Sequence, residues 1–289
     1  MTRQVLARHR GRRAGVSVTA AALSVTLLFV VPAAFAAPAN DNFANAKTLH
    51  LRKNVSGTIN GATKQSGEPH HAKSLATHSV WYRLRVKRKM TVAVNTCKTS
   101  SDTVIAVYTG TSLRGLKVVN YNNDGCNGSG GGSRVTFQAR RGVTYRIAVA
   151  GFTDRGSFRV GAFRLSVPAN DYFPDAVGVT VGEGFSGNTV NATRELGEPR
   201  HQFNRSHTVW FKLSVPAATL VEVTACNIQA VTTYTGNSLR SLARVTPTTS
   251  VHCGEQFQAQ PGVIYHIVLE SGGVGTGYRF STRAVTPTP

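Results

Sequence analysis

The chain has 289 residues, of which 33 are Lys or Arg and 13 are Asp or Glu, giving a formal net charge of +20. Its four cysteines include no CxxC pair, and the sequence contains neither a P-loop nor an HExxH motif. These absences argue against a Cys-based zinc site, a nucleotide-binding loop and a zinc-protease helix. The GSGGGS stretch at Gly128 lacks the strand–helix context of a nucleophile elbow.

Residues 1–36 are predicted to be a signal peptide. An Arg-rich start is followed by an apolar run from about Ala14 to Val31, and then by small residues at Ala34 and Ala36. Cleavage after Ala36 is expected, and an uncleaved membrane anchor is the alternative. No second apolar stretch reaches spanning length, so we expect no transmembrane segment in the mature chain. The mature protein is predicted to be secreted, either free or associated with the cell wall.

The remaining sequence is one unit written twice. ANDNFANA at Ala39 returns as ANDYFPDA at Ala169, and YTGTSLRGL at Tyr108 returns as YTGNSLRSL at Tyr234. A period of about 130 residues indicates a domain duplication, because solenoid repeats are far shorter. With a boundary near Pro168, we call residues 37–167 the first repeat and residues 168–289 the second repeat.

Both repeats are predicted to consist of short strands. Val80, Tyr82, Leu84 and Val86 alternate with Trp81, Arg83, Arg85 and Lys87, and the second repeat has Val209, Phe211, Leu213 and Val215 in the same pattern. Alternating sets also occur at residues 143–149 and 263–269, and no amphipathic helix is evident. The predicted fold class is all-β, with two tandem antiparallel β-sandwich domains of jelly-roll or Greek-key type.

Export permits disulfides, and four cysteines allow three pairings. The duplication selects one bridge in each repeat, Cys97–Cys126 and Cys226–Cys253. Each bridge closes a loop of nearly thirty residues and is expected to stabilise the fold by roughly 3–4 kcal/mol.

The order of motifs resembles a known family. The motifs N-D-x-F, A-T-x-x-x-G-E-P-x-H, H-[ST]-V-W, a Cys, Y-T-G-x-S-L and F-x-A-x-x-G-x-x-Y-x-I follow one another in both repeats. In this order they are similar to secreted bacterial pre-peptidase C-terminal-like (PPC-like) domains. The resemblance implies β-sandwich modules without catalytic activity, some of which bind calcium, polymeric substrates or cell surfaces. We expect the modules to act without an attached catalytic domain.

Each repeat carries a Glu followed by two His before a Trp. The sets are Glu68, His71 and His78, and Glu198, His201 and His207. A two-His-one-carboxylate metal site, and with it a metal-dependent hydrolase, is one interpretation. The other is that the Glu accepts backbone N–H bonds while the His residues close a loop over the next strand. The His spacing is seven residues in one repeat and six in the other, which favours the loop-closing interpretation.

Calcium is a further candidate ligand, because it takes six to eight oxygen ligands from carboxylates and carbonyls. The first repeat offers Asp41, Glu68, Asp102 and Asp124, whereas the second repeat lacks equivalents of Asp102 and Asp124. The alternative for the Asn-Asp pairs at Asp41 and Asp171 is that their side chains cap turns.

Charge separates the repeats most clearly. The first repeat holds 20 basic and 5 acidic residues, a net charge of +15, while the second holds 8 of each. The densest point is RLRVKRK, which the second repeat replaces with KLSVPAA. The candidate ligand-binding face comprises Trp81, Arg83, Arg85, Lys87, Arg88 and Lys89.

Such a cationic strip concentrates polyanions. The expected partner is an anionic extracellular polymer or cell-wall glycan, and the alternative is a solvated or protected sheet edge. Sequence-specific nucleic-acid binding is not expected, because no recognition helix is predicted. Trp81 and Trp210 are interpreted either as carbohydrate-stacking platforms or as scaffold residues.

Overall fold

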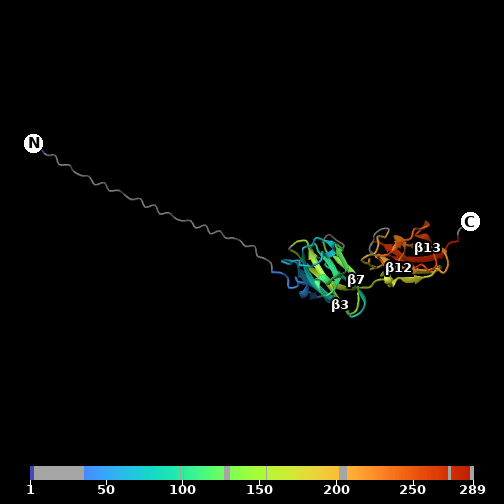
Figure 1. Cartoon of the computed structure of the whole chain (residues 1–289), viewed down its shortest axis with the longest axis horizontal. Coiled ribbons are helices and arrows are strands. Elements are labelled where there is room, and N and C mark those ends of the chain that lie inside the picture. Colours follow the sequence, from blue (N-terminus) through green and yellow to red (C-terminus); the bar gives the residue numbers. More distant parts are fainter. Residues whose placement is uncertain are drawn as a thin grey trace. The chain divides into compact units, whose positions relative to one another are not determined.

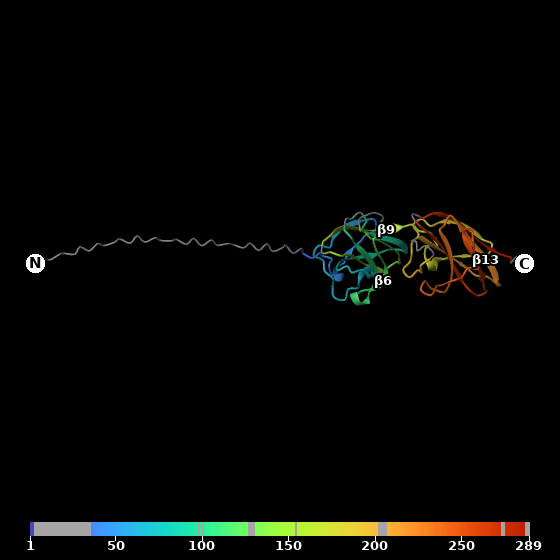
Figure 2. The ribbon, with the colours of Figure 1, turned by 90° about the horizontal axis from the view of Figure 1, so that it is seen from above.

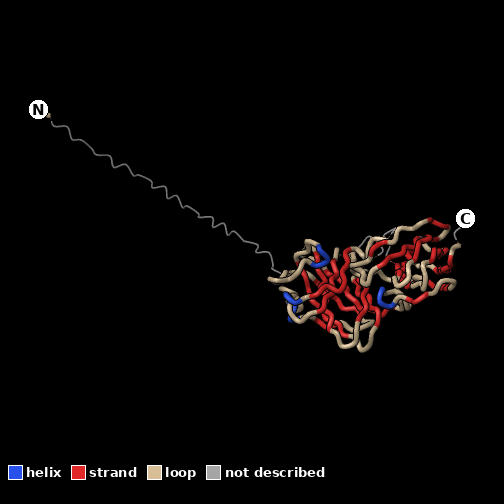
Figure 3. The backbone as a smooth tube through the Cα atoms, turned by 45° about the vertical axis from the view of Figure 1, so that its right-hand side comes forward, coloured by secondary structure: helices blue, strands red, loops and turns tan. Residues whose placement is uncertain are grey.

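The computed structural model of the protein describes residues 1–2, 36–97, 99, 101–126, 131–153, 155–201, 207–272 and 275–286. Nearly all regular structure in these ranges is β-strand, and the helices are four three-residue 3-10 turns (Figure 3). The all-β prediction is confirmed. None of the helices in the described ranges reaches the length and apolarity that a bilayer span requires. The predicted signal peptide lies almost wholly in residues 3–35, outside the described residues.

The first repeat forms two sheets (Figures 1 and 2). One has the order β1 (Lys47–Thr48), β3 (His78–Arg85), β8 (Thr144–Gly151), β5 (Val104–Thr109) and β6 (Lys117–Asn123). The other has the order β2 (Asn54–Thr58), β9 (Ser157–Leu165), β4 (Met90–Asn95) and β7 (Arg134–Ala139). Every pairing is antiparallel except the parallel pair of β1 and β3.

The second repeat forms two sheets of matching order. One is β10 (Val177–Val179), β12 (His207–Leu213), β18 (Tyr265–Ser271), β14 (Ala230–Thr235) and β15 (Ala243–Arg244). The other is β11 (Gly184–Asn188), β19 (Gly277–Ala284), β13 (Thr219–Cys226), β17 (Gly254–Ala259) and β16 (Thr249–Val251). β10 again pairs in parallel with β12, so this uncommon feature occurs in both repeats.

The core of each repeat follows the predicted alternation. Val80, Tyr82 and Leu84 are buried in one apolar cluster with residues of the opposing sheet, including Val92 and Phe158. The equivalent Val209, Phe211, Leu213 and Val215 are buried in the second repeat. The outward positions of β3 differ in exposure: Arg83 and Arg85 are exposed, whereas Trp81 is fully buried. β3 ends at Arg85, so Lys87, which was predicted on the strand face, lies in the bend that follows.

Both predicted disulfides are confirmed. Cys97 and Cys126 are bonded with their Cα atoms 5.6 Å apart, and Cys226 and Cys253 are bonded with theirs 4.9 Å apart. Next to the first bridge, the hydroxyl of Thr96 bonds at 2.6 Å to that of Thr103, which lies inside the loop that the bridge closes. A disulfide stabilises a protein mainly because it reduces the number of conformations that the unfolded chain can adopt.

Replacing Cys97 and Cys126 together with Ala is expected to lower the free energy of unfolding by about 3 kcal/mol, because the unfolded chain regains the entropy of a 29-residue loop. Urea denaturation followed by circular dichroism measures the change. The matched control is the Cys226→Ala, Cys253→Ala variant, which opens a 27-residue loop and should lose a similar amount. If the Cys97→Ala, Cys126→Ala variant were as stable as the disulfide-bonded parent, the predicted role of the bridge would be contradicted.

Candidate functional site

The Glu-His stretch of the first repeat is a buried hydrogen-bonded cluster. One oxygen of Glu68 accepts bonds from His71 Nε2 at 2.8 Å and from the Ser79 hydroxyl, and the other accepts the Gln65 N–H at 2.8 Å. The second ring nitrogen of His71 lies 2.8 Å from the hydroxyl of Tyr108. The cluster therefore ties the loop at residues 62–77 to strands β3 and β5, as the loop-closing interpretation requires.

The second repeat closes the same loop with one changed donor to the carboxylate. Glu198 accepts bonds from the Thr208 hydroxyl at 2.8 Å and from Trp210 Nε1 at 3.1 Å. His201 Nδ1 lies 2.9 Å from the Tyr234 hydroxyl, but its Nε2 is 3.7 Å from Glu198, beyond hydrogen-bond length. The carboxylate therefore keeps its hydroxyl and backbone N–H donors, because the Glu195 N–H bond at 3.0 Å repeats that of Gln65, and only the His71 bond is replaced, by that of Trp210.

The structure does not assemble the two-His-one-carboxylate site of the metal interpretation. His78 lies at the start of β3, where its ring bonds to the Thr77 hydroxyl at 2.8 Å and not to Glu68. Within the described ranges, one group of three His, Cys, Asp or Glu ligand atoms lies within 4.8 Å, namely Cys226, His252 and Cys253. Both of its sulfurs are in the disulfide, so they are not available as thiolate ligands.

The four carboxylates considered for calcium lie in different settings. Asp41 is buried and accepts bonds from the Thr63 N–H at 2.6 Å and the Thr63 hydroxyl at 2.8 Å, while Glu68 is occupied as described above. Burial, and after it the charge of Asp124, raises the pKa of Asp102, which places these two carboxylates within electrostatic range. Among the described residues they do not gather into a three-ligand group.

The Asn-Asp pairs make long-range bonds rather than the local turn caps that were predicted. The Asn40 amide donates to the Trp81 carbonyl, 41 residues away, at 2.9 Å. Asp171 accepts from the Thr193 hydroxyl at 2.9 Å and so repeats the Asp41–Thr63 bond. These buried side chains therefore hold the start of each repeat against its Glu-His loop.

Trp81 is not part of a ligand-binding face. Its side chain is 0% exposed and packs edge-on against Phe43 at 5.1 Å and against His71 at 5.4 Å. Trp210 is equally buried against Phe173 and His201. Strand alternation correctly places Trp81 outside the sandwich core, but the Glu-His loop then covers it. The inclusion of Trp81 in the binding face was wrong, and the scaffold interpretation fits both residues.

The cationic residues predicted on this face are exposed. Arg83 and Arg85 project from the outer face of β3, and Lys87, Arg88 and Lys89 follow in the bend. Lys89 makes an exposed ion pair with Asp175 at 3.1 Å, which contributes little to stability. The residue pattern alone missed two further arginines, Arg141 and Arg146.

The structure brings Arg141 and Arg146 to the same face as Arg83 and Arg85. Strand register sets Arg146 of β8 directly opposite Arg83. Arg141 is bridged to Val86, and with Arg85 and Lys87 it lines a shallow pocket of about 460 Å³. We define the basic surface as Arg83, Arg85, Lys87, Arg141 and Arg146. The alternation at residues 143–149 places Arg146 outside the core, but only strand pairing reveals its neighbour.

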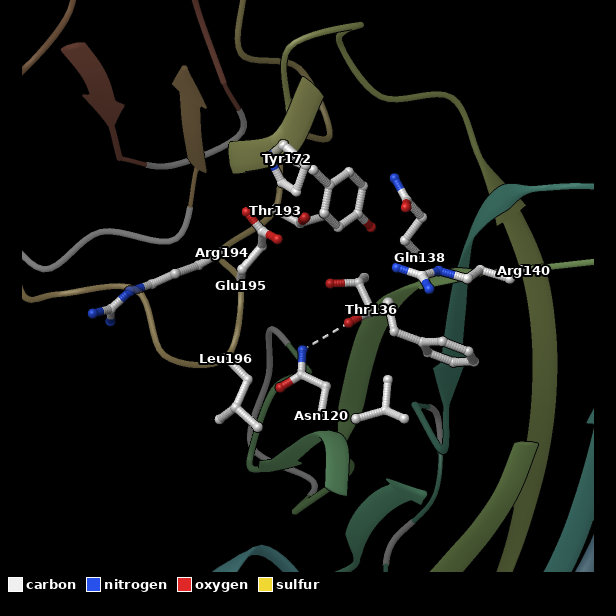
Figure 4. A pocket seen from close by; sticks show the side chains of 12 residues that line it. Asn120, Thr136, Gln138, Arg140, Tyr172, Thr193, Arg194, Glu195 and Leu196 are labelled. Carbon is white, nitrogen blue, oxygen red and sulfur yellow. Dashed lines mark hydrogen bonds between the residues drawn. The ribbon is translucent and has the colours of Figure 1, made fainter. Parts of the chain in front are cut away.

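A second pocket, of about 200 Å³, lies among residues 119–140 and 172–196 (Figure 4). Burial raises the pKa of Glu195 in its lining to about 7, and the charges of Glu198 and Asp171 act in the same direction. A carboxyl group that titrates near neutrality is a feature of acid–base sites. Here, however, Glu195 accepts a 2.6 Å bond from the Phe173 N–H, which assigns it a structural role at the start of the repeat.

No family model and no curated protein matches the chain. Solved structures do match it at low identity. The pre-peptidase C-terminal domain of a collagenase from Bacillus anthracis is 12% identical, over 40% of this chain and 93% of that domain, with a TM-score of 0.28. A tandem CBM22 domain of Xyn10C from Paenibacillus barcinonensis is 7% identical, over 82% of this chain and 85% of that one, with a TM-score of 0.19. At these values neither match assigns a family or the role of a residue.

Replacing Glu68 with Ala is expected to lower the free energy of unfolding by about 3 kcal/mol, because the buried donors of His71 and Ser79 and the partly buried Gln65 N–H lose their acceptor. Chemical denaturation followed by circular dichroism measures the loss.

The control is Asp124→Asn, which alters an exposed carboxylate in the same repeat and should change stability by no more than about 0.5 kcal/mol. Equal effects of the two substitutions would show that the Glu-His cluster does not hold the loop.

Proposed function

We propose that the chain is an exported, non-catalytic binding protein whose first repeat binds anionic polymers or cell-surface glycans through the basic surface. The two repeats are PPC-like β-sandwich modules in this proposal. The observation that carries it is the unpaired state of the basic surface: within the described ranges, none of its five cations forms an ion pair.

The contrast between the duplicates supports this proposal. The second repeat has equal numbers of acidic and basic residues, and carboxylates pair with two of its arginines. Arg283 lies 2.7 Å from Glu222, and Arg194 lies 3.8 Å from Glu198. A requirement for solubility alone does not explain why one copy concentrates unpaired charge and the other balances it. A requirement to hold a polyanion does.

The geometry of the basic surface suits an extended polymer. Arg83 and Arg85 are two positions apart on one face of β3, which separates them by about 7 Å along the strand. The shallow pocket between Arg85 and Arg141 continues the same line of charge beyond the strand end. A flexible chain with regularly spaced anionic groups can therefore contact several cations at once, and multiple contacts raise its overall affinity.

The alternative of a metal-dependent hydrolase is less well supported. It relies on the Glu-His stretches, in which Glu68 and His71 are buried and bonded to each other and to structural partners. A reacting group there would have no open coordination position to use.

The test is co-sedimentation of the mature protein with insoluble cell-wall and polysaccharide preparations at low and high salt. The parent should bind anionic preparations at low salt and lose binding at high salt, because surface charges are screened. Changing Arg83, Arg85 and Lys87 together to Gln should weaken binding at low salt by about ten-fold or more.

A control variant removes three charges elsewhere in the same repeat. Lys53, Arg159 and Arg164 are exposed and belong to, or adjoin, the sheet that contains β2 and β9. Their replacement with Gln lowers the net charge equally and should weaken binding much less. Equal losses in the two variants would indicate non-specific attraction by net charge, and no binding to any anionic polymer would refute the proposal.

A further inference from the structure

Two arginines face each other on the outer surface of the first repeat. Thr48 of β1, Arg83 of β3, Arg146 of β8 and Tyr108 of β5 are successive partners across one row of the sheet. Side chains that are directly opposite on one face of an antiparallel pair have Cβ atoms about 5 Å apart. The guanidinium groups of Arg83 and Arg146 are therefore held as close neighbours by backbone pairing.

Each guanidinium is fixed by a separate contact. The Arg146 group lies over the ring of Phe43, 4.5 Å from its centroid, and Phe43 is itself buried against Trp81. Arg83 donates from Nε to the Thr48 hydroxyl at 2.9 Å. Neither contact supplies a negative charge. Nε and Nη1 of Arg146 are buried without any acceptor among the described residues.

The arrangement is unfavourable for the empty protein. Like charges directly opposite on a sheet destabilise it, and buried donors without acceptors add to the cost. Burial, and after it the charge of Arg83, lowers the pKa of Arg146. An arginine nevertheless stays protonated in proteins, so deprotonation cannot relieve the repulsion.

The second repeat avoids this repulsion between opposed cations. Its equivalent row of paired residues is Gly178, Lys212, His266 and Tyr234. His266 stands where the first repeat has Arg146, and its ring packs on Phe173 at 4.4 Å. Burial lowers the pKa of His266, with Lys212 acting in the same direction, so the imidazole is neutral beside the lysine at pH 7. The fold thus tolerates a row with one charge, and only the first repeat retains two.

We propose that Arg83 and Arg146 together bind one tetrahedral oxyanion, a phosphate or sulfate group. This assignment names the anionic group of the polymer and in that respect rests on the proposed function. A planar carboxylate has two oxygens and satisfies a single guanidinium fork. A tetrahedral group has additional oxygens in other directions, so it can accept bonds from both guanidinium groups at once and place its negative charge between them.

The first experiment uses small probes. Isothermal titration of the mature protein with inorganic sulfate, inorganic phosphate and acetate, at constant ionic strength, should show binding of the two tetrahedral ions and at least about ten-fold weaker binding of acetate. The variant Arg83→Lys, Arg146→His, which copies the second repeat into the first, should lose the sulfate and phosphate binding. The reciprocal variant, Lys212→Arg with His266→Arg, should gain a second site.

A second experiment separates this inference from the proposed function. Dextran sulfate, polyphosphate and polygalacturonate, matched in charge density, are compared for binding to the parent and to the exposed-site variant Arg83→Lys, which keeps the charge. The parent should prefer the sulfated and phosphorylated polymers, and Arg83→Lys should reduce that preference by about ten-fold, because an ammonium lacks the bidentate fork.

Equal binding of all three polymers, with no effect of Arg83→Lys, would overturn the oxyanion site while leaving polyanion binding intact. Binding of sulfate ion at Arg83 and Arg146 without binding of any polymer would support the site and refute the proposed function. The control Arg159→Lys changes an exposed arginine of the other sheet and should alter neither result.

Discussion

A buried carboxylate determines what the outer face of each repeat can present. Glu68 lies inside the protein and must accept bonds from the groups around it, which fixes the loop at residues 62–77 against the strands. His71 of that loop packs on Trp81, which forms an apolar cluster with Ala106 and Ala148 on the outer face of the sheet. Glu198 achieves the same closure with the equivalent hydroxyl of Thr208 and the equivalent backbone N–H, while Trp210 Nε1 takes the place of the His71 ring nitrogen.

The covered apolar area ends where the cationic row begins. Phe43 stands at this boundary, because one side of its ring system packs on Trp81 and the guanidinium of Arg146 lies over its face. A cation over an aromatic ring gains electrostatic attraction without losing its charge. Phe43 therefore contacts both the residues under the Glu-His loop and the basic surface.

Sequence patterns predicted the features that depend on local alternation and on the duplication. The inward positions of β3 and both disulfides are of this kind. Trp81 was misplaced because alternation reports which side of the strand a residue occupies, and not whether another segment covers that side. Arg146 was missed because it is a single charge in an apolar strand, and its relation to Arg83 arises only from strand register. Likewise, carboxylates in predicted loops, such as Asp41 and Asp102, need not meet, since sequence does not give the path of a loop.

The divergence between the repeats distinguishes scaffold from function. Phe43 and Phe173 are retained, and each packs on the equivalent Trp and on the side chain at the Arg146 or His266 position. The row of paired residues beside each Phe differs between the repeats at three positions. The first repeat has Thr48, Arg83 and Arg146, and the second has Gly178, Lys212 and His266. If the fold required two permanent charges in this row, the second repeat would need them as well. The paired arginines therefore cost stability without serving the scaffold, and proteins keep such local costs mainly where a ligand offsets them.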